Sequence, residues 1–112
     1  MMKPKEKPVK KPHLTGNLEK MFQKGITLVD FNAPWCAPCR VQKPIMDQLA
    51  GQYRGKARVL ALDVDEHRKA AMGLGITSIP TLIIFKNGRE MRRFVGLQPA
   101  EVLSTAIEKI LR

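Results

Sequence analysis

The sequence lacks a hydrophobic run long enough to cross a membrane. A membrane-spanning helix needs about 18 apolar residues or more, and the longest apolar stretch, residues 76–85, is interrupted by two threonines, a serine and a proline. The N-terminus has the lysines of a secretory signal but not its apolar segment. We therefore expect no interaction with membranes and a cytoplasmic location.

Cysteine is scarce, with only Cys36 and Cys39 in the chain. A scaffold stapled by disulfides is excluded, because a bridge between these two closes too short a loop to join distant segments. A pair this close is either redox-active or half of a metal site. A structural zinc ion needs four ligands, and the two histidines, His13 and His67, do not lie at zinc-finger spacing from Cys39. We therefore expect no metal.

Acidic residues are also few, with 10 Asp and Glu against 20 Lys and Arg, which gives a net charge of +10. Residues 1–12 carry five of the lysines, one glutamate and three prolines. Prolines at this density favour extended chain, so we predict a flexible basic tail over residues 1–12 and one domain over residues 13–112. No aromatic residue is interleaved with the lysines to stack on bases, so we do not expect nucleic-acid binding. Electrostatic attraction to nucleic acid or to an acidic partner is the alternative interpretation of the tail.

Apolar runs and helical patterns alternate along the rest of the chain, which predicts an α/β fold. Strands are expected at residues 26–31, 57–64, 81–85 and 89–95, and helices at residues 17–24, 36–53, 66–72 and from residue 98 onward. Strand–helix–strand units imply a parallel pair of strands, and Asn87-Gly88 indicates a tight hairpin between the last two strands. The sheet should therefore be mixed.

The predicted helix over residues 36–53 contains Pro44, which should kink it. Ile45, Gln48, Leu49 and Gln52 lie at helical spacing, which favours the helix.

The two cysteines follow a predicted buried strand and open this helix. Cys36 lies at the helix N-terminus, where free N–H groups and the helix dipole stabilise a thiolate and lower its pKa. We therefore predict that Cys36 is the nucleophile. Cys39, one turn further on, should be more buried and should resolve the mixed disulfide. Ala37 and Pro38 shape the intervening loop, since proline fits the first turn of a helix.

Four motifs occur in a fixed order: Val29-Asp30-Phe31, the run APWCAPCR over residues 33–40, Ile79-Pro80-Thr81, and the run FKNG over residues 85–88. With these motifs, about residues 14–112 resemble the thioredoxin family. The resemblance implies a thioredoxin domain with a central mixed sheet of four to five strands, flanked by helices on both faces. Residues 9–14, which match the first strand of the family, support it poorly because they contain two lysines and a proline.

The resemblance also implies a role for Asp30, because the matching acid in the family is buried behind the cysteines and assists proton transfer. Burial would raise the pKa of Asp30 and suit it to act as a base for the resolving thiol. The alternative interpretation is a carboxylate at a strand end that faces water.

A substrate-binding surface is implied in the same way. The family has a cis peptide bond where Ile79-Pro80 stands, and the backbone edge at Ile79 would pair with an extended substrate. An ordinary trans proline is the alternative. Trp35, Val95 and Gly96 match the apolar rim around the exposed sulfur, although Trp35 could instead pack in the core.

Three positions depart from the family pattern. Ala37 replaces the usual glycine between the cysteines, and Asn32 replaces an aromatic residue that often follows the strand. Ala61 stands where many members have a lysine near the buried acid, and the loss of that cation would raise the pKa of Asp30 further.

The resemblance implies a thiol–disulfide oxidoreductase, a protein-disulfide reductase that carries electrons in cell redox homeostasis by dithiol exchange through Cys36 and Cys39. The sequence has no Gly-rich phosphate loop, so we expect no bound cofactor. Reducing equivalents should come from a thioredoxin reductase that uses NADPH or another donor. The expected partners are this reductase and disulfide-containing target proteins, and the protein itself is expected to be a monomer.

Two alternatives stay open. The same fold serves isomerases and oxidants, although disulfides are kept reduced in the cytoplasm. The chain could also be a redox-independent scaffold that binds partners through its basic surface. Replacement of both cysteines would abolish the activity of an oxidoreductase but would change little in a scaffold.

Overall fold

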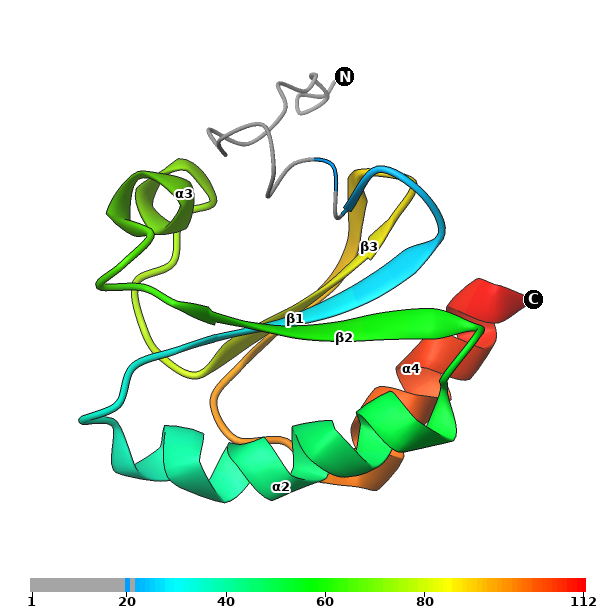
Figure 1. Cartoon of the computed structure of the whole chain (residues 1–112), viewed down its shortest axis with the longest axis horizontal. Coiled ribbons are helices and arrows are strands. Elements are labelled where there is room, and N and C mark those ends of the chain that lie inside the picture. Colours follow the sequence, from blue (N-terminus) through cyan, green and yellow to red (C-terminus); the bar gives the residue numbers. More distant parts are fainter. Residues whose placement is uncertain (1–19, 21) are drawn as a thin grey trace.

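The structure is a computed structural model that describes residue 20 and residues 22–112 (Figure 1). The predicted tail, residues 1–12, lies outside the described residues, as do the family's first strand at residues 9–14 and half of the helix predicted at residues 17–24. Within the described part, no helix has the length and apolar character needed to span a bilayer.

The elements alternate in the predicted order from the first strand onward. They are β1 (Ile26–Asn32), α2 (Ala37–Gln52), β2 (Ala57–Asp63), α3 (Arg68–Gly73), β3 (Thr81–Lys86), β4 (Arg89–Val95) and α4 (Ala100–Leu111). The described strands form one sheet in the order β2-β1-β3-β4. β1 pairs with β2 in parallel and with β3 antiparallel, and β3 pairs antiparallel with β4. The predicted mixed sheet is therefore confirmed.

Helices cover both faces of the sheet, with α2 and α4 on one face and α3 on the other (Figure 1). Side chains on a strand point alternately to the two faces, so the sheet has two cores. Leu28 packs in the core under α2 and α4, whereas the adjacent Val29 packs with Phe22 and Phe85 on the opposite face. The same alternation places Asp30 on the α2 face, which is also the face of the cysteines.

The β3–β4 hairpin turns at Asn87 and Gly88, as predicted, with φ angles of 52° and 86°. A two-residue turn of this kind needs positive φ at both positions, which asparagine and glycine tolerate best. Asn87 is also tied to Gly25 before β1. Its main-chain N–H donates to the Gly25 carbonyl oxygen at 2.9 Å, and its Oδ1 accepts the Gly25 N–H at 2.9 Å. The hairpin is thereby fixed to the start of the central strand.

Helix α2 begins after Cys36 and runs through Pro44 to Gln52. The buried positions of the helix are Cys39, Gln42, Met46 and Leu49. Of the residues noted at helical spacing, Leu49 is buried, whereas Gln48 and Gln52 are exposed.

The end of α2 is joined to α4 through Tyr53, which is 2% exposed. The Tyr53 hydroxyl donates to Glu108 Oε2 at 2.8 Å. The two helices on this face therefore form one layer that carries the cysteines at one end.

Candidate functional site

The cysteines lie at the junction of β1 and α2. Cys36 is the N-cap of α2, with extended backbone (φ −89°, ψ 111°), and its Sγ accepts the Cys39 main-chain N–H at 3.2 Å. The first turn of α2 holds Ala37 and Pro38 and contains no acidic residue. The free N–H groups and the dipole of this helix end therefore favour a thiolate at Cys36, with no carboxylate in the turn to oppose it.

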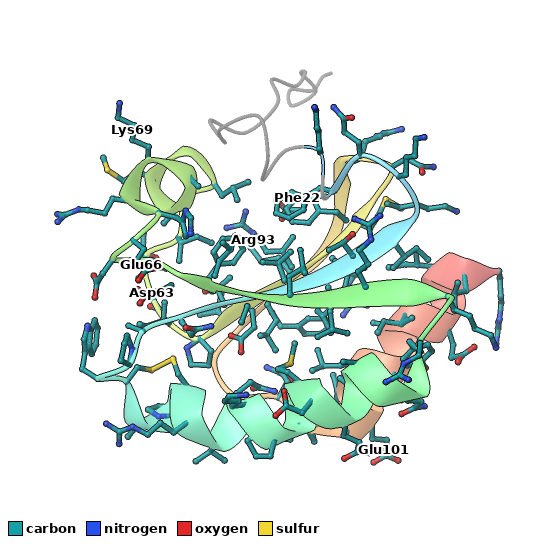
Figure 2. All side chains as sticks on the ribbon, viewed as in Figure 1. Phe22, Asp63, Glu66, Lys69, Arg93 and Glu101 are labelled. Carbon is teal, nitrogen blue, oxygen red and sulfur yellow. A yellow bond between two sulfur atoms is a disulfide. The ribbon has the colours of Figure 1, made fainter. Side chains whose placement is uncertain are left out.

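Cys36 and Cys39 form a disulfide, with Cα atoms 5.2 Å apart (Figure 2). The expected difference in burial between them is not found, since each residue is 5% exposed. Ala33 is buried with both cysteines, and Val64 and Ile79 pack against the same cluster. These neighbours cover Cys36 as well as Cys39 when the bridge is closed.

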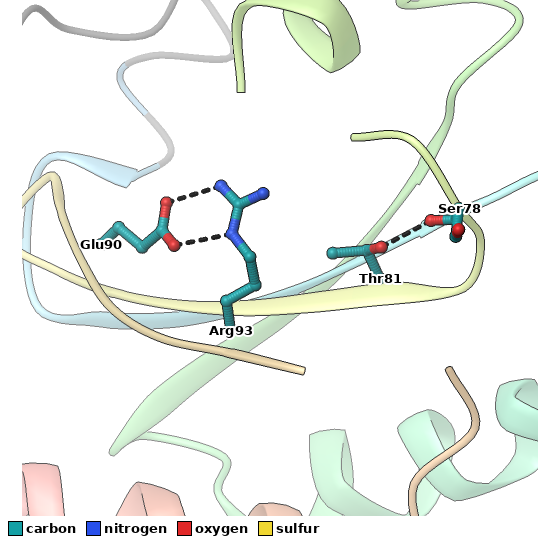
Figure 3. Close-up of polar contacts among 4 residues, drawn as sticks. All are labelled: Ser78, Thr81, Glu90 and Arg93. Atoms are coloured by element: carbon teal, nitrogen blue, oxygen red, sulfur yellow. Dashed lines mark hydrogen bonds and ion pairs between the residues drawn. The ribbon is translucent and has the colours of Figure 1, made fainter. Parts of the chain in front are cut away.

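The Ile79–Pro80 peptide bond is cis, as predicted. The Ile79 carbonyl oxygen lies 3.8 Å from Cys36 Sγ, so this loop faces the cysteines. Thr81, which starts β3, donates a hydrogen bond from its hydroxyl to the Ser78 carbonyl oxygen and closes the loop around the proline (Figure 3). The backbone at Ile79 is therefore held beside the Cys36 sulfur.

A second loop is fixed to the same proline. The Gly96 N–H donates to the Pro80 carbonyl oxygen at 2.8 Å, and Gly96 has a φ of 96°, a conformation that favours glycine. Val95, immediately before it, is 61% exposed. The bond between Gly96 and Pro80 therefore holds the loop after β4 in contact with the loop that faces Cys36.

Trp35 is 66% exposed, which rules out the core-packing alternative. Its Nε1–H donates to Asp65 Oδ2 at 2.8 Å, so the ring is oriented although it faces solvent. Asp65 was not among the predicted site residues, and neither was Leu97, an exposed apolar residue next to Gly96. An isolated apolar side chain in a short loop was the available signal for Leu97, but nothing in the sequence marks Asp65 as the partner of Trp35.

Asp30 is 3% exposed, so the predicted burial is confirmed and the alternative of a water-facing carboxylate is wrong. Its Oδ1 has no hydrogen-bond partner among the described residues. Burial raises the pKa of Asp30 from 3.8 to about 6, because the charged form loses hydration. A carboxyl with this pKa can gain or lose a proton near neutral pH.

A pocket of about 250 Å³ extends between β1, β2 and α2 and reaches Asp30. Cys39 and Ala61 also line it, as do Lys43 and Asp47 on α2. Lys43 is paired with Asp47, with Nζ 3.1 Å from Oδ2, and both side chains are largely exposed. The carboxyl of Asp30 and the second cysteine therefore border the same cavity.

Several basic side chains on the described surface have local partners. Arg93 makes two hydrogen bonds with the Glu90 carboxylate, at 2.7 and 2.8 Å (Figure 3). The Arg92 guanidinium lies over the Phe94 ring, 4.6 Å from its centre. Lys86 Nζ donates to the Ile110 carbonyl oxygen at 3.4 Å. These contacts account for three of the surface cations within the fold itself.

No group of three or more His, Cys, Asp and Glu side chains that could hold a metal ion occurs among residue 20 and residues 22–112. The chemistry that the site offers rests on two sulfurs, a buried carboxyl and a main-chain edge.

Comparisons with known proteins agree on one family. The thioredoxin family model matches residues 9–109. The thioredoxin of Staphylococcus saprophyticus is 48% identical over 95 residues, which cover 85% of this chain and 91% of that protein. The thioredoxin of Staphylococcus aureus is 43% identical over the same coverage. A mutant thioredoxin from Halobacterium salinarum has a solved structure similar to this one, with a TM-score of 0.78, 33% identity, and coverage of 85% of this chain and 83% of that one.

Proposed function

Because this chain belongs to the thioredoxin family and is a thiol–disulfide oxidoreductase, we propose that its specific activity is the reduction of protein disulfides. The observation that carries the proposal is the position of Cys36. Its sulfur lies at a helix N-terminus and 3.8 Å from the Ile79 carbonyl oxygen, where an extended target could bind beside it. The proposed nucleophile, Cys36, therefore lies next to the main-chain edge of Ile79 that would bind the target.

In the first step, the Cys36 thiolate attacks one sulfur of a target disulfide. The S–S bond of the target breaks, a mixed disulfide forms at Cys36, and the first target sulfur leaves as a thiolate that takes up a proton. In the second step, the Cys39 thiolate attacks Cys36 Sγ. The mixed disulfide breaks, the second target thiolate is released, and Cys36 and Cys39 become bridged. Two electrons have then passed from the dithiol to the target.

Asp30 is proposed as the base that deprotonates Cys39 for the second step. Both residues line the same pocket, and the Asp30 Oδ1 atom has no partner among the described residues. A pKa of about 6 leaves the carboxyl mostly ionised at pH 7 yet basic enough to accept a proton. A carboxyl with the ordinary pKa of 3.8 would be a weaker base.

The target is proposed to bind as an extended strand along the main chain of Ile79. The Pro80 carbonyl already accepts the Gly96 N–H, so pairing with the target is assigned to Ile79. Trp35, Val95 and Gly96 are proposed to form the apolar rim that contacts target side chains, because the first two are largely exposed. Recognition of the main chain in this way would suit many different sequences.

The oxidised pair is proposed to be recycled by a thioredoxin reductase, with electrons from NADPH or another donor. No cofactor is assigned to the chain itself. We place the protein in the cytoplasm as a monomer, with disulfide-containing proteins as its targets.

A redox titration tests this proposal. Trp35 is the only tryptophan and precedes Cys36 in the chain, so its fluorescence should follow the two-electron transition in thiol–disulfide buffers. A reductase should have a midpoint well below that of the glutathione pool. A midpoint near that pool or above it would indicate an isomerase or oxidant. If neither fluorescence nor thiol counting detected a transition, the interpretation of the chain as a redox-independent scaffold would be favoured.

A further inference from the structure

Gln42 is a fully buried amide in the middle of the helix that carries the cysteines. It is 0% exposed and lies three residues after Cys39. Its Nε2 donates to the Gln98 carbonyl oxygen at 3.0 Å, and its Oε1 accepts the Gln98 N–H at 2.8 Å. The side chain thus bonds both main-chain groups of one residue that is 56 positions away.

Gln98 belongs to residues 96–99, the segment that joins β4 to α4; we call it the β4–α4 segment. Two anchors hold the segment. The Gly96 N–H is bonded to the Pro80 carbonyl at one end, and Gln98 is bonded to Gln42 at the other. Leu97 lies between the anchors and is 46% exposed. An exposed apolar side chain is therefore presented from backbone that is fixed on both sides.

The chemistry of position 42 indicates that its amide serves the segment rather than the core. The neighbouring buried positions on α2, Met46 and Leu49, are apolar. Glutamine is seldom fully buried unless its polar atoms are bonded. Here two bonds go to main-chain groups of Gln98, outside the helix, and a weaker one goes from Nε2 to Met46 Sδ within it, at 3.7 Å. If they were lost, the N–H and carbonyl of Gln98 would be left without these partners in a partly buried place, at a cost in free energy.

We propose that Gln42 is a positioning residue for target recognition. It fixes the β4–α4 segment to the cysteine-bearing helix, so that Val95, Gly96 and Leu97 keep a constant distance from Cys36. This inference rests on the proposed reduction of protein disulfides. It predicts that Gln42 matters for targets that reach the β4–α4 segment and not for small disulfides that contact the sulfur alone.

The test compares Gln42→Met with Gln48→Met. Methionine keeps most of the side-chain length and removes both bonds to Gln98, and Gln48 is an exposed residue on the same helix. Reduction is measured with a disulfide in an extended peptide and with dithiobis(nitrobenzoate), a small aromatic disulfide. For Gln42→Met we expect a loss of about tenfold in kcat/KM with the peptide, mainly through KM, as two lost hydrogen bonds imply. The small disulfide should react at the wild-type rate, and Gln48→Met should match the wild type with both.

An unchanged peptide rate in Gln42→Met would overturn the inference. An equal loss with both disulfides would also overturn it, because that result indicates damage to the helix or to the cysteines. Failure of the proposed function looks different, since the wild type itself would then fail to reduce the peptide disulfide.

Hydrogen exchange keeps the inference testable if Gln42→Met does not fold. In the wild type, the Gln98 amide should exchange about 100-fold more slowly than an unprotected amide, as expected for a bonded group in a fixed segment. Exchange of this amide at the unprotected rate would show that Gln42 does not hold the segment.

Discussion

Asp30 and Ala61 are register partners across the parallel strands β1 and β2, and both line the pocket behind Cys39. The position beside the buried carboxyl therefore holds a methyl group. No side-chain charge at Ala61 offsets the dehydration of Asp30, and the pKa of Asp30 rises to about 6 through burial. The basicity of this group thus depends on which residue occupies the neighbouring strand.

Ala61→Lys should lower the pKa of Asp30 below 6. An ammonium group placed near a carboxylate favours the ionised form, typically by 1–3 pKa units within about 4–6 Å. The pKa can be read from the carboxyl ¹³C shift of Asp30 across a pH titration. Ala61→Met is the matched control, because it adds a chain of similar size without charge. The same shift in both variants would contradict an electrostatic cause.

Asp30→Asn should remove a pH-dependent loss of stability. The unfolded carboxyl releases its proton near pH 3.8 and the folded one near pH 6, so between these values the folded state holds more protons. Stability therefore falls as pH rises through this window, and above pH 6 the loss is complete at about 3 kcal/mol. Urea unfolding at pH 3.5 and pH 8 should show a gain for Asp30→Asn at pH 8 alone. Equal gains at both pH values would point to packing instead.

The same variant should slow disulfide reduction, because the amide cannot take the proton of Cys39. The loss should be of the order of 100-fold or more if Asp30 acts as a general base. Rates measured from pH 6 to pH 8 would decide this, and rates equal to the wild type throughout would remove Asp30 from the mechanism.

Cys39→Ser should trap the first intermediate. Without the second sulfur, Cys36 can form a mixed disulfide but cannot resolve it. Incubation of reduced Cys39→Ser with a disulfide peptide should give a covalent adduct, visible by mass spectrometry and released by a small thiol. Cys36→Ser is the control and should give none. Adduct at Cys39 in Cys36→Ser would reverse the proposed order of the two cysteines.

Asn87 should contribute to stability through two separable effects. Asn87→Gly keeps the positive φ and loses the side-chain bond to Gly25, at a cost of about 1 kcal/mol. Asn87→Ala loses that bond and also leaves left-handed backbone, with a φ of 52°, to alanine, which tolerates it less well than asparagine, for a total of about 2 kcal/mol. Urea unfolding of both variants separates the two contributions. An Asn87→Ala protein as stable as Asn87→Gly would leave no role for the backbone conformation.

Local patterns predicted most of the fold because the physical signals were local. The apolar run at β1 and the Asn87-Gly88 turn depend on neighbours in sequence, and both formed where they were expected. The redox pair was also local, since Cys36 and Cys39 are separated by two residues. The cis bond at Pro80 is different, because only resemblance to a family predicted it.

Local sequence patterns could not predict contacts between segments that are distant in the chain. Nothing in the local sequence pattern marks Gln42 as a fully buried residue. A buried glutamine is only favourable when its partner is known, and Gln98 lies 56 residues away. The hydrogen bond between Trp35 and Asp65 also joins residues that are distant in sequence. Equal burial of the two cysteines likewise depends on how Ala33, Val64 and Ile79 pack around the closed bridge.

The bridge between Cys36 and Cys39 spans 5.2 Å between Cα atoms, and helix geometry alone sets residues three apart at about 5 Å. Opening the bridge therefore demands little rearrangement of the main chain. The reduced and oxidised forms would therefore have nearly the same shape, and a partner must distinguish them at the sulfurs. The oxidised protein then competes with the reduced protein for the same binding sites on its partners. The direction of electron transfer would depend on the relative concentrations of the reduced and oxidised forms more than on any difference in their affinity for partners.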